Sequence, residues 1–288
     1  MDKMKKVPEP GVYKGISLDE YLAWDAFSSH MVGPALRSAK HLKHAMDEEH
    51  KPSDPMIIGS LVDAIILEPR AMDRFGVLPA TAPDAKGIMK PFSTRLNSAK
   101  KMIEDMEAEG ITPVTLEQMD VARLIGQAIR ENEAAARIVA ESQKQVSIVW
   151  HDEDTGIPCK GRLDMVDKES VSDLKTTKNA SKSSFSKDIA NYGYHIQAAM
   201  YVDGWEALNK QRQAFCFITA ENCRPFGCAV YGLGTESLET GHHLYKVALR
   251  RFADYMDTDP QLQNGYSNLV EPIDVPFWEI KRVLEEGE

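Results

Sequence analysis

The 288-residue chain has few cysteines, no long apolar stretch and no excess of basic charge. Its four cysteines are irregularly spaced, unlike the disulfide framework of a small secreted protein. No apolar run approaches the roughly 18 residues that a membrane span requires. The charged start of the chain, MDKMKKVPEPG, lacks the apolar segment of a secretory signal. We therefore expect a cytoplasmic protein that does not enter a membrane.

Motifs for several common chemistries are absent as well. The sequence contains no Gly-rich Walker loop and no dinucleotide-binding fingerprint, so neither ATP-driven work nor nicotinamide chemistry is indicated. Its eight histidines show no H-E-x-x-H or comparable spacing, which leaves a zinc site with little support.

The chain also lacks a positive charge balance, because 34 basic residues against 44 acidic ones give a net charge of −10. This average argues against a protein that is basic over its whole surface, but nucleic-acid binding depends on where the charges lie. Residues 86–101 hold five basic groups and no acid, and residues 175–187 hold four lysines and no acid. Such local tracts suit an enzyme that must release a polyanion, and solvated loops are the alternative interpretation.

The order of hydrophobic patterns predicts a mixed α/β chain with a mainly helical N-terminal part. Residues 1–16 are rich in proline and glycine and are expected to be extended. Residues 17–140 are expected to be mainly helical. Within that part, helical patterns cover about 18–46, 56–69, 98–109 and 115–140, and residues 76–97 have the composition of a loop.

The character of the sequence changes near Gln145, where alternating patterns begin. Residues 145–175 predict three short antiparallel strands joined by tight turns. Further elements are expected as a helix at about 185–209, strands at 213–221 and 226–231, and a long helix at 235–256. We expect residues 17–283 to form one domain with its sheet-containing core at 141–283, followed by an acidic tail at 284–288.

Asp164, Asp173 and Lys175 form the pattern with the clearest chemical meaning, D-x8-D-x-K. Because successive side chains of a strand alternate faces, Asp173 and Lys175 are expected to point the same way. The short turn before them can bring Asp164 alongside. Two close carboxylates repel unless a cation neutralises them, and hard oxygen ligands suit Mg²⁺ or Mn²⁺. The spacing alone is weak evidence, because an ordinary ion pair on an exposed strand has the same pattern.

Gln197 and Tyr201 stand four residues apart on the expected helix, with Tyr194 about two turns before Tyr201. Residues three or four positions apart share a helix face. This polar and aromatic face could be directed at the carboxylates, or it could be ordinary helix surface.

The run GIPCKGRLDMVDKESVSDLKTTKNAS, followed by NYGYHIQAAMYVDG, resembles the core of the PD-(D/E)xK nucleases. More closely, it resembles the RecE-like (exonuclease VIII) branch, which is encoded by phages and prophages and is related to the RecB nuclease domain. The segments FSSHMVGPALRSAKHLK, MIIGSLVDAIILEP and GYSNLVEPIDVPFWEIKRV resemble further parts of that family. The resemblance thus covers about residues 12–283, and it implies a restriction-endonuclease-like core with a central mixed sheet flanked by helices and an N-terminal helical region.

The resemblance assigns roles to the residues of the D-x8-D-x-K pattern. It implies that Asp164 and Asp173 are the metal carboxylates and that the backbone carbonyl of Leu174 is a further ligand. It implies that Lys175 is the catalytic lysine. The implied cofactor is Mg²⁺ or Mn²⁺.

The resemblance also extends to side chains outside the strands, with two departures. Gln197 and Tyr201 correspond to the family's Q-x-x-x-Y on the helix behind the site. Asp63 stands where the family's G-x-x-x-H has a histidine ligand, and an aspartate can still bind a hard cation. Gln145 stands where many relatives carry a glutamate, and a neutral amide is a weaker ligand.

Five basic residues are the expected DNA contacts. Arg162 corresponds to the family's basic residue before the first aspartate, and it is expected to touch a phosphate. The two basic tracts supply the other four, which are Lys90, Arg95, Lys178 and Lys182.

Together these features predict a metal-dependent DNA exonuclease. The resemblance implies 5′→3′ digestion of double-stranded DNA ends, a ring-like homo-oligomer (a trimer or a tetramer), and a single-strand annealing protein (RecT-like) as partner. It also implies a phage or prophage origin and a role in recombination inside a bacterial host. An endonuclease or single-strand nuclease with the same site is one alternative, and a catalytically silent DNA-binding module is another.

Overall fold

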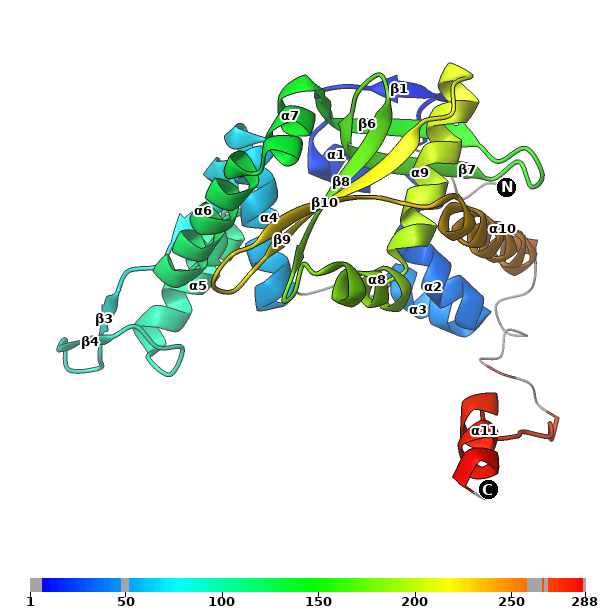
Figure 1. Ribbon diagram of the computed structural model, residues 1–288. Helices are drawn as coiled ribbons and strands as arrows, with labels where there is room; N and C mark the ends of the chain where they lie inside the picture. The colour runs from blue at the N-terminus through cyan, green and yellow to red at the C-terminus, as the bar shows by residue number, and fades with distance from the viewer. Residues whose placement is uncertain (1–6, 48–51, 258–265, 267–268, 287–288) are drawn as a thin grey trace.

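The computed structural model describes residues 7–47, 52–257, 266 and 269–286 (Figure 1). Its centre is a six-stranded sheet with the strand order β1-β6-β7-β8-β9-β10. Neighbouring strands are antiparallel except β8 and β9, which run parallel. The predicted central mixed sheet is therefore confirmed. Its strands are β1 (Gly11–Tyr13), β6 (Gln143–His151), β7 (Pro158–Val166), β8 (Ser170–Thr177), β9 (Ala214–Glu221) and β10 (Cys228–Gly232).

The meander of β6, β7 and β8 has the antiparallel connectivity that the alternating sequence predicts. Its second turn is closed by Asp167, whose Oδ1 accepts the backbone N–H groups of Glu169 at 2.7 Å and Ser170 at 2.8 Å. An aspartate at this place offers the turn an acceptor that the backbone lacks. The turn fixes where β8 begins and therefore where Asp173 lies relative to β7.

Helices cover both faces of the sheet (Figure 1). One face packs against a core that includes Phe27 and the buried side of α9, and the other packs against α4 and α6. The helices of the first face are α2 (Ser29–Arg37), α3 (Ala39–Asp47), α8 (Lys182–Asn191), α9 (Tyr194–Asn209) and α10 (Thr235–Asp257). Those of the second face are α4 (Asp54–Ile66), α6 (Leu116–Glu131) and α7 (Glu133–Glu141).

The remaining described elements lie around this three-layered centre. They are α1 (Leu18–Leu22), the 3₁₀ helix η1 (Pro69–Arg74), α5 (Asn97–Ala108), α11 (Phe277–Glu286), and the small strands β2 (Phe75–Val77), β3 (Thr81–Pro83), β4 (Met89–Pro91) and β5 (Thr112–Val114). β2 pairs with β5, and β3 pairs with β4. The β3–β4 hairpin projects away from the central sheet (Figure 1).

Three expected helices are divided in the structure, each at a residue that stops a helix. The helix expected at 115–140 ends at Asn132, whose side chain caps α7 by accepting the Ala135 N–H at 3.0 Å. The one expected at 185–209 is divided at Gly193, whose φ of 68° is left-handed and suits glycine. The pattern at 18–46 forms α1, α2 and α3, and the last two meet at the extended residue Ser38.

Other boundaries also differ from the sequence predictions. The segment 76–97 is not a plain loop, because it contributes to β2 and contains β3 and β4. Residues 11–13, expected only to be extended, form the edge strand β1 of the central sheet. The acidic tail expected from residue 284 begins inside a helix, since α11 continues to Glu286. The segments 1–6 and 287–288 of the expected ends lie outside the described residues.

Among the described helices, none combines the length and the apolar character that crossing a membrane would require.

Candidate active site

β7 and β8 separate at Asp164, and this separation opens the sheet. They pair only through residues 165–166 of β7 and 171–172 of β8, whereas β8 is paired with β9 along its whole length. The Leu174 N–H finds its acceptor in Asp164 Oδ2, at 2.9 Å. A carboxylate thus replaces a missing strand–strand hydrogen bond, and the bond holds Asp164 beside β8.

The side-chain alternation of β7 reverses at the same place. Leu163 packs in the α9 core and Met165 in the α4 core, although residues two apart on a strand normally share a face. Opposite Asp164, Gln145 has a φ of 51°, in the left-handed region that non-glycine residues rarely adopt. Backbone irregularities of this kind are concentrated at functional sites, where they redirect a side chain.

Asp173 and Lys175 lie one pleat apart on β8 and face the same side, as the alternation predicts. Lys175 Nζ is 2.5 Å from Asp173 Oδ2, and the Asp173 side chain is only 3% exposed. Asp173 Oδ2 is buried, and among the described residues it has no hydrogen-bond partner besides this ion pair. Such an oxygen can accept a further positive partner.

The crowding of charges changes the protonation of this cluster. Burial and then the nearby Asp173 raise the pKa of Asp164 to about 7, despite the opposing effects of Lys175 and the Leu174 N–H. Burial lowers the pKa of Lys175, but the carboxylates of Asp173 and Asp164 outweigh it, and the net pKa is raised. Lys175 therefore carries a positive charge at neutral pH, while Asp164 is only partly ionised.

Asp63 reaches the same cluster from α4, on the other side of the sheet. Burial and then the negative charge of Asp164 raise the pKa of the Asp63 carboxyl well above its usual range. The positive charge of Lys175 opposes this rise. Gly59, one turn earlier on α4, faces Thr176 of β8. A Cβ at position 59 would lie 3.7 Å from Thr176 Oγ1, which is an ordinary contact. The packing of α4 on β8 thus brings a third carboxylate within electrostatic influence of Asp164 and Asp173.

The donor set fits a hard divalent ion at Asp164 and Asp173. No three His, Cys, Asp or Glu side chains are arranged as a ready metal site within the ranges that the structure describes. Asp173 Oδ2, however, is buried with no hydrogen-bond partner besides Lys175 among the described residues, and a further cation beside it would relieve the repulsion that raises the pKa of Asp164. Carboxylate oxygens are the ligands that Mg²⁺ and Mn²⁺ favour. The roles predicted for Asp63 and for the Leu174 carbonyl stay predictions.

A chain of polar contacts holds Asp164 from the β6 side. Gln145 Nε2 lies 3.4 Å from Asp164 Oδ1, and Gln145 Oε1 accepts a 2.6 Å hydrogen bond from Arg162 Nε. Arg162 also forms a 3.4 Å ion pair with Glu68 and donates to the Ile16 carbonyl at 2.8 Å.

This arrangement gives Arg162 protein partners, and its expected contact with a DNA phosphate stays a prediction. Its side chain is 8% exposed and its guanidinium is engaged by protein groups, so in this structure it orients Gln145 rather than facing solvent. Glu68 was not recognised as part of the site from the sequence, although it lies in the MIIGSLVDAIILEP segment. Its position before Pro69, two residues after the end of α4, was the available signal.

Tyr201 and Gln197 of α9 lie behind the carboxylates. Gln197 Nε2 donates to Tyr201 Oη at 3.1 Å. Burial and then the charge of Asp173 raise the pKa of Tyr201 to about 12, so the phenol is neutral at physiological pH. The Tyr201 ring can pack closely on β7 because it faces Gly161, where a Cβ would lie 3.1 Å from the ring.

The sequence between residues 28 and 265 matches a family described as a PDDEXK-like domain of unknown function (DUF3799). The chain belongs to this PDDEXK-like family. The match covers most of the chain and includes Asp164, Asp173 and Lys175. Membership in the PD-(D/E)xK superfamily, as the sequence predicted, is therefore confirmed.

One solved structure agrees with the PDDEXK-like assignment at the level of fold. The chain superimposes on the crystal structure of an exonuclease candidate from Eubacterium rectale with a TM-score of 0.57 and 16% identity, covering 92% of this chain and 97% of that one. An alkaline exonuclease from Laribacter hongkongensis matches 58% of this chain and 87% of its own with 12% identity, but a TM-score of 0.26 is too low to support an argument. No curated protein matches the chain.

The four expected DNA contacts from the basic tracts occupy two places on the PDDEXK-like fold. Lys178 and Lys182 are exposed just beyond the end of β8 and at the start of α8, close in sequence to Lys175. Lys90 and Arg95 are exposed on the projecting β3–β4 hairpin and just after it. The structure therefore does not bring all four into one patch at the carboxylates.

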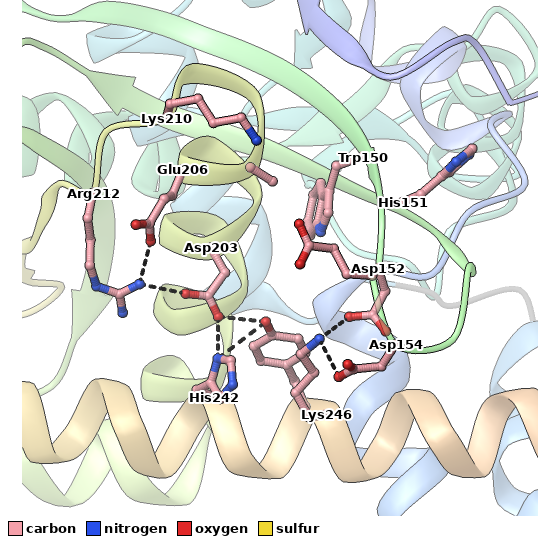
Figure 2. Close-up of a pocket in the computed structure, with 13 residues that line it drawn as sticks. Trp150, His151, Asp152, Asp154, Asp203, Glu206, Lys210, Arg212, His242 and Lys246 are labelled. Carbon is pink, nitrogen blue, oxygen red and sulfur yellow. Dashed lines mark hydrogen bonds and ion pairs between the residues drawn. The ribbon is translucent and has the colours of Figure 1, made fainter.

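A separate pocket of about 590 Å³ lies between the β6–β7 turn, α9 and α10 (Figure 2). Asp203 accepts a 2.5 Å hydrogen bond from Tyr245 Oη and lies 2.6 Å from His242 Nδ1 and 2.9 Å from Arg212 Nη1. Lys246 contacts Asp152 and Asp154 across the same pocket. Arg212 and Lys246 are thus paired with acids, and none of the residues named here belongs to the Asp164 and Asp173 cluster.

Proposed function

We propose that the protein is a metal-dependent DNA exonuclease that hydrolyses phosphodiester bonds of linear double-stranded DNA. The observation that carries the proposal is the convergence of Asp164, Asp173 and Lys175 where β7 and β8 separate, within a PDDEXK-like fold. The similarity to an exonuclease candidate supports the fold on which this chemistry would operate.

Asp164 and Asp173 would hold Mg²⁺ or Mn²⁺, with the Leu174 carbonyl and Asp63 as further proposed ligands. A bound divalent ion supplies polarisation of the phosphate and acidification of a water molecule. Phosphoryl transfer then depends mainly on positioning and on stabilising the charge that develops around phosphorus.

Lys175 would act as a cation rather than as a base. The raised pKa keeps its ammonium protonated at neutral pH, so it can stabilise negative charge on the attacked phosphate and orient water, but it cannot readily accept a proton. Asp173 directs the ammonium by their 2.5 Å contact. Tyr201 and Gln197 would complete the wall of the site behind Asp173.

The finer features of this proposal rest on the resemblance to the RecE-like branch. They are 5′→3′ polarity, a homo-oligomeric ring around the duplex, a single-strand annealing protein as partner, and a role in phage-type recombination in the cytoplasm of a bacterial host. The exposed Lys178 and Lys182 beside the end of β8 suit backbone contacts near the cut phosphate.

The deciding experiment is digestion of linear duplex DNA labelled at the 5′ or the 3′ end, with Mg²⁺ or Mn²⁺ and with a circular duplex as control. An exonuclease releases mononucleotides from one labelled end first and spares the circle. Lys175→Ala should lose turnover while it keeps most of its DNA affinity. Cleavage of the circle would replace this proposal with an endonuclease.

A catalytically silent DNA-binding module is the second candidate. It is motivated by Asp63 and Gln145, which stand where relatives carry a histidine and a glutamate. That candidate predicts DNA binding without release of label at any metal concentration.

A further inference from the structure

An exposed aromatic ring lies at the edge of the proposed active site. Tyr192 is 69% exposed. Its ring stacks on Tyr194 with a centroid distance of 5.5 Å and an interplanar angle of 29°. Tyr194 in turn lies against Lys175, whose Nζ is 4.8 Å from the centroid of its ring. Tyr192, Tyr194 and Lys175 therefore form a continuous path from solvent to the proposed catalytic ammonium.

The backbone fixes the place of Tyr192 although its ring is exposed. Its backbone N–H donates to the Asp188 carbonyl at 2.9 Å at the end of α8, and the next residue, Gly193, turns the chain with a φ of 68°. α9 then begins at Tyr194. The left-handed turn between two helices thus puts two tyrosines, two positions apart, in contact on one side.

We propose that Tyr192 is a stacking platform for the base of the nucleotide next to the phosphate that is cut. This inference rests on the proposed nuclease function. An aromatic face stacks on any base, so such a platform adds affinity without sequence preference. The Tyr192 ring connects solvent to Lys175 through a single intervening ring, that of Tyr194. Exposed Lys178 and Lys182 supply positive charge just after β8 and at the opposite end of α8 from Tyr192.

The proposed ligand is an unpaired base. A base that presents its inner face to Tyr192 has left the duplex stack, so the end of the DNA then opens by at least one base pair. Opening is easiest at a mismatched end, because less pairing energy is lost there. The platform therefore predicts that an enzyme with Tyr192 prefers a mismatched end over a paired one.

The test compares wild type with Tyr192→Phe and Tyr192→Leu, which keep and remove the aromatic face at similar size. The substrate is a linear duplex with 2-aminopurine at its terminal nucleotide. Tyr192→Phe should keep KM within about twofold. Tyr192→Leu should raise KM about tenfold, within the range that loss of one stacked base gives, with a smaller change in kcat. The preference of the enzyme for a mismatched end over a paired end should also be smaller in Tyr192→Leu than in wild type.

Fluorescence reports the stacking directly. In EDTA, without cleavage, the 2-aminopurine signal should be quenched by wild type and Tyr192→Phe and not by Tyr192→Leu. Phe277→Leu is the matched control, because Phe277 is 75% exposed on α11, outside the proposed site. Its KM and quenching should equal those of wild type. Because Tyr192 is largely exposed, thermal unfolding of all four proteins should be similar, which separates a binding defect from misfolding.

The outcomes distinguish the platform from the exonuclease proposal. If wild type cleaves DNA and Tyr192→Leu matches it in KM and quenching, the platform is wrong and the nuclease stands. If no variant cleaves DNA but quenching depends on the ring at position 192, the platform stands as a DNA-binding element and the exonuclease is wrong. If wild type neither cleaves nor quenches, both are overturned.

Discussion

The backbone N–H of Leu174 donates a 2.9 Å hydrogen bond to the carboxylate of Asp164. The residue that we propose as a metal ligand therefore also completes the hydrogen bonding between β7 and β8. Substitution can separate metal binding from strand pairing, because an asparagine at position 164 keeps an oxygen acceptor for the Leu174 N–H but loses the negative charge.

Asp164→Asn should fold and should lose the reaction. We expect the rate of DNA hydrolysis to fall by about a hundredfold or more, since the divalent ion supplies several kcal/mol of transition-state stabilisation. Initial rates at saturating Mg²⁺ and thermal unfolding measure the two effects. Asp164→Ala should lose the rate and also unfold at a lower temperature, because Leu174 then lacks its acceptor. An active Asp164→Asn enzyme would remove Asp164 from the metal site.

Protonation of Asp164 should make the stability of the metal-free protein depend on pH. Burial and then Asp173 raise the pKa of this carboxyl from 3.8 to about 7. Folding thus favours the protonated form, and the stability it contributes is complete below about pH 3.8 and is lost as the pH rises through about 7.

The measurement is urea unfolding in EDTA from pH 4 to 8, reported as the free energy of unfolding of wild type minus that of Asp164→Asn. This difference should decrease with rising pH across that window. Excess Mg²⁺ should weaken the decrease, because it binds the ionised carboxylate of the folded protein. A difference that is flat with pH would contradict the raised pKa.

Arg162→Lys should impair the site without removing positive charge. A lysine cannot donate from separate nitrogens to Gln145, Glu68 and the Ile16 carbonyl as the guanidinium does. Loss of such supporting contacts typically costs about 10–100-fold in metal affinity or activity.

The discriminating readout for Arg162 is the Mg²⁺ concentration that gives half the maximal rate. A positioning role predicts that this concentration rises in Arg162→Lys, whereas a direct phosphate contact predicts a change in KM for DNA alone. Glu68→Gln should have the same effect in weaker form, because the Glu68 side chain is 38% exposed.

Gly161→Ala should destabilise the fold by about 1–3 kcal/mol, the usual cost of overpacking a core. The added methyl group would lie 3.1 Å from the Tyr201 ring and 3.4 Å from Ile148. Gly59→Ala is the matched control, since its Cβ would make an ordinary 3.7 Å contact with Thr176, and alanine favours a helix interior. Chemical denaturation of both variants checks this. Equal stability of the two would mean that Tyr201 can move away freely.

The sequence predicted the local order of the core well, because strand alternation is a short-range property. The spacing of Asp173 and Lys175 sufficed to put them on one face of β8, and the strands near 145–175 and 213–231 lie where the pattern predicted them. Helix ends were less predictable. A single residue such as Gly193 or Asn132 divides an apolar pattern that reads as continuous.

By itself, the sequence determined the mixed α/β class and the pair of Asp173 and Lys175, since both follow from the repeat of side chains along a strand. Only the tertiary structure decided that Glu68 reaches the site, that Arg162 is buried and turned toward Gln145, and that Tyr192 is exposed and stacked on the ring that covers Lys175. These contacts join residues far apart in the chain. Their distances depend on how α4 and α9 pack on the sheet and on where β7 and β8 separate, which no local spacing encodes.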